Sequence, residues 1–419
     1  MKKIVVRGGR KLKGTIKISG AKNAALPIIG ASLLTKKEVI LHNIPRVTDV
    51  QTITKLLHSA NVNIDFKNNS MRIKAVKLKG ETFSENLSPN KTRMANGLLG
   101  SLLSRLKRVS IPLSGGCEIG TRKIDIHMSA LGKLGASINI RNGQIVAKSN
   151  ELHGSHVMLR YPSVGATENI LIVACLAEGT TTIENAAREP EIIDLASFLN
   201  SMGAEIRGAG TNIIKTNGVD KLSGTEYTII PDRIETGTYS VAAAISNGDI
   251  LLKNTNLSLL KSVVLKFREI GMEIEEANEG VHVTSSGEFC PVDIETGPYP
   301  GFPTDMQPIV TPLLLMADGE STIKETIFDN RFNYGPELRR MDANLKINGD
   351  TINIKGISKL KGAEVKALNI REGASLIIAG LAAEGKTTIS GVHHIFRGYE
   401  NPLSKLKNVG ANCNLITTR

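Results

Sequence analysis

Three patterns of apolar and polar residues recur along the chain and divide it into repeats. The first pattern is an apolar stretch that begins with polar residues. The second is a Gly-containing turn that is followed by β-branched residues. The third is an apolar residue and a Gly, followed by alternating polar and apolar positions. The polar starts lie near residues 22, 93, 164, 236, 305 and 371, which are 66–72 residues apart. This spacing predicts six repeats, each with strands and two helices, and six repeats suit two lobes of three.

Each repeat is expected to contain one buried helix and one helix with a glycine cap. The segment 24–34 is apolar on nearly all sides, which predicts a helix buried in the core. The third pattern ends its helix at a Gly in four copies, Leu134-Gly, Met202-Gly, Ile270-Gly and Val409-Gly. A Gly at this position predicts a left-handed helix C-cap, followed by a strand. The copies at 60–64 and 341–345 lack the Gly.

Basic residues stand at three of the six predicted helix starts. Lys22, Arg93 and Arg371 occupy them, although a positive side chain at a helix N-terminus opposes the helix dipole. A multiply charged phosphate ligand would explain this arrangement, because helix N-termini favour anions. The alternative is that these are ordinary capped helices facing solvent.

Composition narrows the classes of function. The 419 residues carry a formal net charge of +12, which favours anionic partners, but no Trp and only 4% aromatic residues. Base stacking needs aromatic side chains, so a nucleic-acid-binding protein is disfavoured. The basic residues are scattered, which also fits a merely solvated basic surface.

The cysteines and the N-terminus favour a cytoplasmic protein without a metal site. None of the four cysteines forms a CxxC pair, there is no HExxH motif, and sparse unpaired cysteines fit a reducing compartment. The N-terminal segment has no signal-peptide core, and no apolar stretch is long enough to span a membrane.

One cysteine lies in a glycine-rich loop. The segment Gly115-Gly-Cys117-Glu-Ile-Gly-Thr-Arg122 follows a predicted strand at 109–113 and precedes a helix that ends near Leu134. The glycines allow close approach to a ligand, and Arg122 favours the thiolate, so Cys117 is a candidate nucleophile or general acid. A tight turn without catalytic function is the alternative. Cys175 lies in an apolar helix and is expected to be a core residue.

Several long motifs together resemble one family. They include Ser19-Gly-Ala-Lys-Asn-Ala-Ala-Leu-Pro27, the Cys117 loop, Glu184-Asn-Ala-Ala-Arg-Glu-Pro-Glu-Ile192, Pro231 to Thr238, Phe302 to Gln307, Phe328 to Phe332 and Arg397 to Glu400. In this order they are similar to the UDP-N-acetylglucosamine enolpyruvyl transferases (1-carboxyvinyltransferases) of bacterial peptidoglycan synthesis, over essentially the whole chain.

The resemblance implies an α/β (α+β) fold: a two-lobed inside-out α/β barrel of six βαβαββ-like repeats, three per lobe, with the active site in the interlobe cleft. The first lobe would span residues 22–231, and the second 1–21 and 232–419. It also implies transfer of the enolpyruvyl group of phosphoenolpyruvate to the 3-hydroxyl of UDP-N-acetylglucosamine, with release of phosphate and without a metal or organic cofactor.

The family pattern assigns roles to individual residues. It implies Cys117, Asp305 and Lys22 as catalytic residues, with Asp305 as the base and Cys117 as the site alkylated by fosfomycin. The implied phosphoenolpyruvate contacts are Lys22, Arg122, Arg371 and Arg397. The implied UDP-N-acetylglucosamine contacts are Asn23, Arg93, Arg122, Ser163, Val164, Gly165, Asp305 and Ile327.

Two positions depart from the family pattern. Asn369 and Phe396 stand where the family usually has Asp. An Asn side chain cannot act as a base, and losing two carboxylates makes the predicted arginine-rich region more positive. These departures leave a second interpretation open, a weakly active or regulatory paralogue that binds the UDP-sugar.

Overall fold

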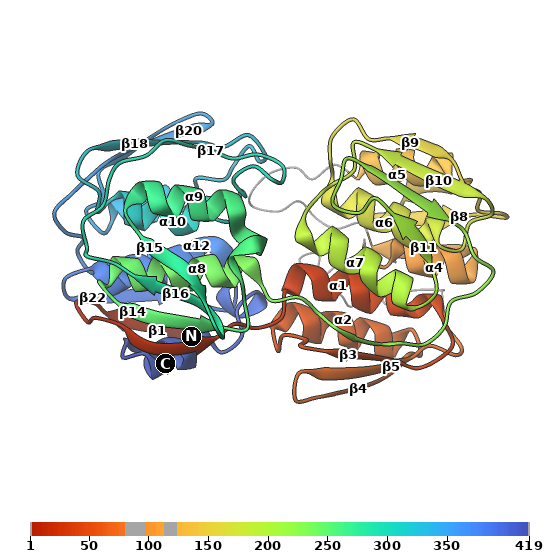
Figure 1. Cartoon of the computed structure of the whole chain (residues 1–419), viewed down its shortest axis with the longest axis horizontal. Helices are drawn as coiled ribbons and strands as arrows, with labels where there is room; N and C mark the ends of the chain where they lie inside the picture. The colour runs from red at the N-terminus through yellow and green to blue at the C-terminus, as the bar shows by residue number, and fades with distance from the viewer. Residues whose placement is uncertain (1, 80–96, 113–123, 418–419) are drawn as a thin grey trace. The chain divides into compact units, whose positions relative to one another are not determined.

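The computed structural model describes residues 2–79, 97–112 and 124–417, and these fold into two compact units. The terminal unit comprises residues 2–19 and 231–417, and the central unit comprises residues 20–79, 97–112 and 124–230. Each unit is shown in Figure 1 with its own helices and sheets.

The helices of the central unit are α1 (Lys22–Ala31), α2 (Thr48–Ser59), α4 (Leu99–Leu106), α5 (Asp125–Lys133), α6 (Val164–Ala174) and α7 (Pro190–Ser201). Its strands are β3 (Val39–His42), β4 (Asn63–Lys67), β5 (Ser70–Lys74), β6 (Arg108–Pro112), β7 (Ser137–Arg141), β8 (Gln144–Lys148), β9 (His156–Met158), β10 (Thr180–Glu184), β11 (Glu205–Arg207), β12 (Ile213–Asn217) and β13 (Glu226–Thr228).

The helices of the terminal unit are α8 (Arg233–Ile245), α9 (Lys261–Ile270), α10 (Gln307–Leu314), α11 (Gly335–Arg339), α12 (Ile370–Ala382) and α13 (Pro402–Asn408). Its strands are β1 (Lys2–Arg7), β2 (Lys13–Lys17), β14 (Asp249–Lys253), β15 (Glu273–Ala277), β16 (Gly280–Thr284), β17 (Ile294–Glu295), β18 (Glu320–Lys324), β19 (Leu345–Asn348), β20 (Thr351–Lys355), β21 (Glu364–Lys366), β22 (Lys386–Ser390) and β23 (Asn412–Thr417).

Within the described residues, each unit holds three small sheets, and five of the six share one plan. In the order β15-β16-β14-β2, the inner strand β14 pairs parallel with β2 and antiparallel with β16. The sheets β17-β18-β20-β19 and β21-β22-β1-β23 of the terminal unit have the same order of pairings. In the central unit the same plan is found in β13-β3-β5-β4 and β11-β12-β10-β9, and β6-β8-β7 forms an antiparallel sheet.

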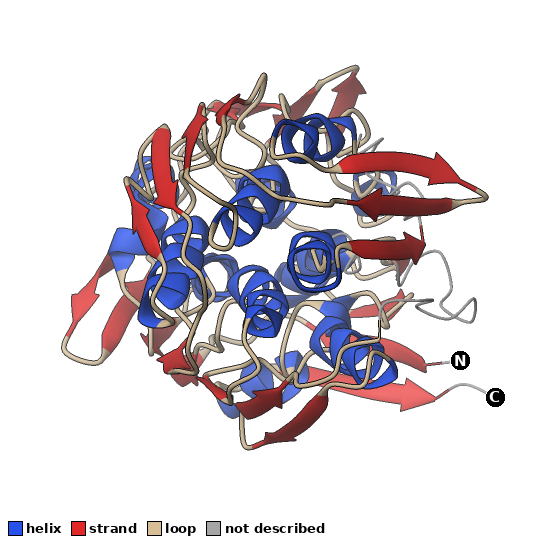
Figure 2. Cartoon of the chain, turned by 90° about the vertical axis from the view of Figure 1, so that its right-hand side faces the viewer, coloured by secondary structure: helices blue, strands red, loops and turns tan. Residues whose placement is uncertain are grey.

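Apolar helices form the core of each unit, and the sheets lie around them. In the terminal unit α8, α10 and α12 pack against one another, and every residue of α8 is buried. Figure 2 shows the same arrangement, with helices inside and strands toward the periphery. The predicted buried segment 24–34 is α1 followed by a single 3₁₀ turn at Ser32–Leu34, and most of its side chains are buried. The burial of this apolar segment confirms the prediction from its hydrophobic pattern.

The left-handed helix caps are also confirmed, and all six copies of the third sequence pattern have one. Gly135, Gly203, Gly271 and Gly410 have φ between 91° and 100°. The two copies without Gly place Asn61 and Asp342 at the same point, with φ of 64° and 65°. Asn and Asp are the residues that tolerate this conformation best after Gly, so the degenerate copies keep the geometry.

Two helices begin within three residues of the predicted positions, and local contacts set their first residues. The helix expected near Thr236 begins at Arg233, because the Asp232 side chain accepts the N–H groups of Ile234 and Glu235 at 2.9 and 3.0 Å. Helix α10 begins at Gln307, so Asp305 lies in the turn that precedes it.

Candidate active site

Lys22 is the first residue of α1 and is buried at its N-terminus. Its Nζ lies 3.4 Å from an Oδ of Asp49, a buried residue in the first turn of α2. Helix α1 has no acidic residue in its first turn and no side-chain cap, so the charge of Asp49 offsets a cation that the helix dipole disfavours. Asn23, the next residue, is half-buried. Sequence reasoning missed Asp49.

The first turn of α6 is capped by Ser163, whose Oγ accepts the N–H of Ala166 at 3.4 Å. The Ser163 carbonyl also accepts a bond from the Thr167 hydroxyl at 2.9 Å. No acidic residue of α6 lies in this turn, so the turn itself supplies no negative charge to offset the N-terminal dipole. Val164 and Gly165 are half-buried, and the turn suits an anion held by backbone N–H groups.

In the terminal unit, Asp305 lies between two arginines. Its Oδ1 accepts from Arg331 Nη2 at 2.8 Å, and its Oδ2 accepts from Arg371 Nε at 3.0 Å. Both guanidinium groups are buried, whereas the Asp305 side chain is 28% exposed. Two charged donors hold the carboxylate ionised and fixed in orientation, and its exposed part remains accessible to a hydroxyl group.

Arg331 is itself held in place. Its Nε and Nη2 donate to the carbonyl of Thr304, at 3.4 and 3.3 Å. The Thr304 hydroxyl in turn donates to buried Glu325, which also accepts the N–H of Ile327 at 2.8 Å. One buried carboxylate therefore links the loop of Ile327 to the turn of Asp305. The motif Phe328 to Phe332 contained Arg331, but sequence reasoning assigned it no role.

Asn369 is the N-cap of α12. Its Oδ1 accepts the N–H groups of Arg371 and Glu372, both at 3.1 Å. Asn and Asp cap helices about equally well, so the departure from the family pattern keeps the cap and removes a negative charge beside Arg371. Phe396 is half-buried and packs against the hydrophobic core of its unit.

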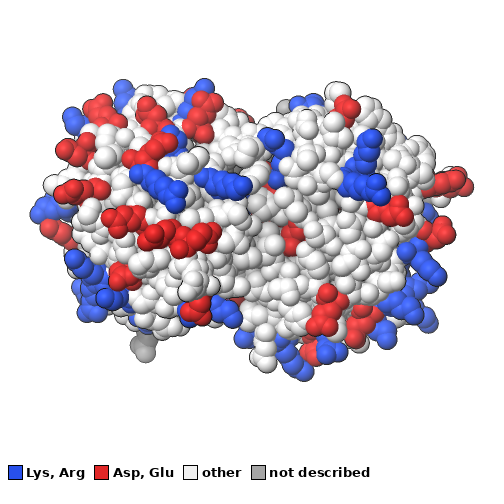
Figure 3. Space-filling model, viewed as in Figure 1, with Lys and Arg blue, Asp and Glu red and all other residues white. Residues whose placement is uncertain are grey.

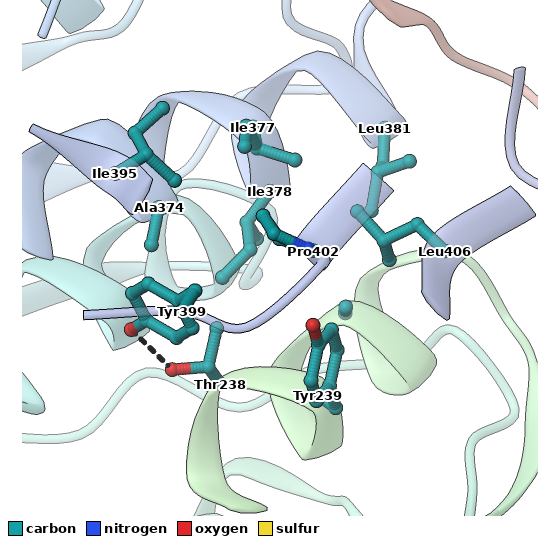
Figure 4. Close-up of a pocket in the computed structure, with 11 residues that line it drawn as sticks. Thr238, Tyr239, Ala374, Ile377, Ile378, Leu381, Ile395, Tyr399, Pro402 and Leu406 are labelled. Carbon is teal, nitrogen blue, oxygen red and sulfur yellow. Dashed lines mark hydrogen bonds between the residues drawn. The ribbon is translucent and has the colours of Figure 1, made fainter. Parts of the chain in front are cut away.

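The aromatic ring of Tyr399 packs against the guanidinium group of Arg371. The Arg371 guanidinium carbon lies 5.3 Å from the centre of the Tyr399 ring, and the Tyr399 hydroxyl pairs with the Thr238 hydroxyl at 2.8 Å (Figure 4). The cavity beside this pair has a volume of about 20 Å³ and an apolar lining. That is room for one water molecule, so this cavity is not a substrate site.

Arg397 lies at the end of a 3₁₀ turn, Ile395–Arg397, and is half-buried. Its charge acts on nearby His394. The pKa of His394 is lowered to about 4, mainly by burial and then by the positive charges of His393, Arg397 and Lys366. Arg397, Lys366 and His393 therefore lie close enough to His394 for their positive charges to act on it.

Three predicted site residues, Arg93, Cys117 and Arg122, lie outside the described residues. The remaining cysteines differ from one another. Cys175 is the buried C-cap residue of α6, and burial raises the pKa of its thiol to about 12. Burial also raises the pKa of Cys413, and Cys290 is exposed. A core role for Cys175 is confirmed.

Sequence comparison now adds to this geometry. The family model of EPSP synthase (3-phosphoshikimate 1-carboxyvinyltransferase) matches residues 6–406. UDP-N-acetylglucosamine 1-carboxyvinyltransferase 1 of Halalkalibacterium halodurans is 46% identical over 415 residues, which cover 98% of this chain and 94% of the relative. The protein of the same name from Caldanaerobacter subterraneus subsp. tengcongensis is 47% identical over 409 residues, 98% of each chain. This chain belongs to the UDP-N-acetylglucosamine 1-carboxyvinyltransferase family.

Solved structures with this mixed α/β fold are also enolpyruvyl transferases. The enolpyruvyl transferase NikO from Streptomyces tendae matches with a TM-score of 0.89 and 20% identity, over 100% of this chain and 99% of that chain. EPSP synthase from Acinetobacter baumannii matches with a TM-score of 0.78 and 18% identity, over 100% of both chains. At such low identity the likeness concerns the fold alone.

Two further observations concern metals and membranes. Among the described residues, no group of three or more His, Cys, Asp or Glu side chains is arranged to hold a metal ion. In the same ranges, no helix is long and apolar enough to cross a membrane. Acidic and basic side chains are interspersed over the face drawn in Figure 3, which agrees with the scattered charge in the sequence.

Proposed function

We propose that this protein transfers the enolpyruvyl group of phosphoenolpyruvate to the 3-hydroxyl of UDP-N-acetylglucosamine and releases phosphate, the first committed step of peptidoglycan synthesis. The observation that carries the proposal is the 46–47% identity, over 98% of the chain, to relatives named for this activity. The Asp305 carboxylate, fixed between two arginines and partly exposed, supports it. The protein would work in the cytoplasm, where both substrates are found.

In the proposed reaction, Asp305 takes the proton of the sugar 3-hydroxyl as that oxygen attacks C2 of phosphoenolpyruvate. Cys117 donates a proton to the methylene carbon C3, which gives a tetrahedral ketal. Loss of a proton from C3 and of phosphate from C2 then restores the double bond. Lys22, Arg122, Arg371 and Arg397 would stabilise the phosphate and carboxylate charges.

The UDP-sugar would lie along Asn23, Arg93, Arg122, the Ser163–Val164–Gly165 turn, Asp305 and Ile327. The N-terminus of α6, with no acidic residue in its first turn, supports a diphosphate there. We also propose the inside-out α/β barrel of six βαβαββ-like repeats, with lobes at 22–231 and at 1–21 plus 232–419 and an active site in the cleft between them. The division of the described residues at 19/20 and 230/231, with three sheets in each unit, supports this arrangement.

Phosphate release tests the function. The purified protein is incubated with phosphoenolpyruvate alone, with UDP-N-acetylglucosamine added, and with 3-phosphoshikimate added. We expect release only with the UDP-sugar. Release with 3-phosphoshikimate instead would assign the chain to the other branch of the matched family. Tight binding of the UDP-sugar without any turnover would favour the regulatory paralogue.

The role of Cys117 has a separate test by intact mass spectrometry after treatment with fosfomycin. An anionic phosphonate epoxide would dock where the phosphoenolpyruvate phosphate docks, so a single adduct on Cys117 is expected, formed faster with UDP-N-acetylglucosamine. Cys117→Ser should not be labelled. An adduct on exposed Cys290, or the absence of any adduct, would contradict the proposed role of Cys117. Cys175 is buried and has a thiol pKa of about 12, so it should stay unmodified.

A further inference from the structure

The side chain of Asn169, on α6, joins three helices of the central unit. Its Oδ1 accepts the N–H of Gly100, in the first turn of α4, at 2.9 Å. Its Nδ2 donates to the Gly165 carbonyl at 3.2 Å and lies 3.2 Å from Nδ1 of His127 on α5. Asn169 is 1% exposed. One buried amide thus ties α4 and α5 to the first turn of α6.

These contacts decide where His127 carries its proton. The backbone N–H of Gly100 can only donate, so the Asn169 atom that faces it is the oxygen. Nδ2 then has two protons, one for the Gly165 carbonyl and one for His127 Nδ1. Because Nδ1 must accept, the neutral ring carries its proton on Nε2. Burial lowers the pKa of His127 to about 4, with Asp125 opposing the shift, so the ring is neutral near pH 7.

The His127 ring also packs directly on the α6 turn. A Cβ added to Gly165 would lie 3.1 Å from Cε1 and 3.3 Å from Nε2 of His127. Gly165 does not have positive φ, so it is the close approach of the ring, and not the backbone conformation, that favours Gly here. The edge of the ring that carries the Nε2 proton is therefore set against the Ser163–Gly165 turn.

We propose that Asn169 and His127 are positioning residues for the diphosphate of the sugar nucleotide. Asn169 fixes the first turn of α6 against two neighbouring helices and keeps the proton of the neutral His127 ring on Nε2, a hydrogen-bond donor beside that turn. This inference rests on the proposed function, in which Ser163, Val164 and Gly165 contact the UDP-sugar. It adds to them two residues, from α5 and from the second turn of α6, that set the turn's geometry.

The protonation state is tested by ¹⁵N NMR of the full chain with labelled histidine. We expect His127 to show the neutral Nε2–H form from pH 8 down to about 5. In Asn169→Asp an oxygen would replace Nδ2 beside Nδ1, so the ring should gain an Nδ1 proton and titrate at higher pH. An Nδ1–H or charged ring in the unmodified protein would overturn the proposal.

Kinetics separates positioning from simple packing. His127→Gln keeps an acceptor for Asn169 and a donor beside Gly165, whereas His127→Phe keeps the ring shape without either. We expect the KM for UDP-N-acetylglucosamine to rise about tenfold in His127→Phe, roughly one hydrogen bond, and less than about threefold in His127→Gln. The KM for phosphoenolpyruvate should stay unchanged. His58→Phe, at an exposed position of the same unit, is the control. Equal losses in the Gln and Phe variants would overturn the proposal.

Calorimetric titration with UDP separates this inference from the proposed function. The same ranking of affinities, unmodified above Gln above Phe, is expected without turnover. An inactive protein that shows this ranking would refute the proposed enzyme and keep the positioning role. An active protein without this ranking would support the proposed enzyme and refute the positioning role.

Discussion

The two units hold their candidate anion-binding groups in different physical ways. In the terminal unit, Arg331 and Arg371 supply full charges around Asp305, and both guanidinium groups are buried. In the central unit, the α6 turn offers backbone N–H groups, a serine cap and a neutral imidazole. A buried charge must be matched by another, whereas a helix terminus needs no counter-charge.

This difference indicates which chemistry the arginine cluster and the α6 turn each suit. A charged cluster fixes a carboxylate that can take a proton and stabilises charge that changes during a reaction. A helix terminus binds a constant charge, such as a diphosphate that does not react, at lower energetic cost. The proposed base and the proposed diphosphate site follow this division. Changes in the arginine cluster should therefore reduce turnover, and changes in the α6 turn should reduce affinity.

The largest effect should follow Asp305→Asn. The amide keeps the size of the side chain but cannot accept the 3-hydroxyl proton, so kcat should fall about 10³-fold, within the range for loss of a general base. Binding of UDP-N-acetylglucosamine, measured by calorimetry, should change only a few-fold. A variant that keeps its phosphate-release rate would remove Asp305 from the chemistry.

Arg331→Met should come next, because it leaves a buried ion cluster without one partner. Loss of one side of a buried pair costs about 3–5 kcal/mol, so the melting temperature should drop, and kcat should fall about 10²-fold as Asp305 loses one of its two fixed donors. The control is Lys355→Met, which breaks a pair with Glu320 in which both partners are exposed, and it should leave both quantities unchanged. A kcat equal to that of the unmodified protein would show that Arg371 alone positions Asp305.

Arg397→Ala tests whether the positive charge of Arg397 acts directly on phosphoenolpyruvate. A charge-assisted hydrogen bond is worth about 1.5–3 kcal/mol, so the KM for phosphoenolpyruvate should rise about 10- to 100-fold. The KM for UDP-N-acetylglucosamine should rise less. Equal increases for the two substrates would contradict the placement of Arg397 on the smaller ligand.

The repeats show how much of the fold the sequence could predict. Local patterns specify local geometry, so the buried α1 and the left-handed caps at Gly135, Gly203 and Gly271 were predicted correctly. The repeat spacing placed one helix start only near Thr236, whereas the side chain of Asp232 sets the first residue of α8 at Arg233. Capping depends on which atoms meet, and hydrophobic periodicity carries no information about that.

The candidate site shows which contacts could not be predicted from the sequence. Motif resemblance pointed to Asp305 and Arg371, but it did not reveal that Arg331 is the second partner of Asp305 or that Asp49 pairs with Lys22. These contacts join residues 26 and 27 positions apart, and only the fold brings them together. Asn169 was invisible for the same reason, since its partners Gly100 and His127 lie 69 and 42 positions away in the sequence.

Variants of Ser163 test the α6 turn without disturbing the arginines. Ser163→Ala removes the cap, which costs about 1 kcal/mol, and should raise the KM for UDP-N-acetylglucosamine about fivefold. Ser163→Asp keeps a capping oxygen and the stability, but it adds a negative charge where the diphosphate would bind, so its KM should rise more than that of Ser163→Ala. If Ser163→Asp binds UDP-N-acetylglucosamine normally, the diphosphate does not lie at this turn.

The smallest effect is expected from Asn369→Asp, which restores the residue usual in the family. Asp caps as well as Asn, and the N–H groups of Arg371 and Glu372 would still be satisfied, so the melting temperature should not change. The new carboxylate would lie beside buried Arg371 and partly neutralise its positive charge. Arg371 would then attract an anionic ligand less strongly.

The KM for phosphoenolpyruvate in Asn369→Asp should therefore rise two- to fivefold, by less than for Arg397→Ala, because the cation is only partly neutralised and not removed. The KM for UDP-N-acetylglucosamine should change less, because neither Asn369 nor Arg371 is among the proposed contacts of the UDP-sugar. Steady-state kinetics with each substrate varied in turn measures both values. A lower KM for phosphoenolpyruvate, or a faster turnover, would mean that the family's carboxylate assists the reaction and that the chain has lost activity by replacing it. An unchanged KM would mean that Arg371 is already committed to Asp305 and contributes no charge to the ligand, which would leave Arg397 as the main described cation of the phosphoenolpyruvate site in the terminal unit.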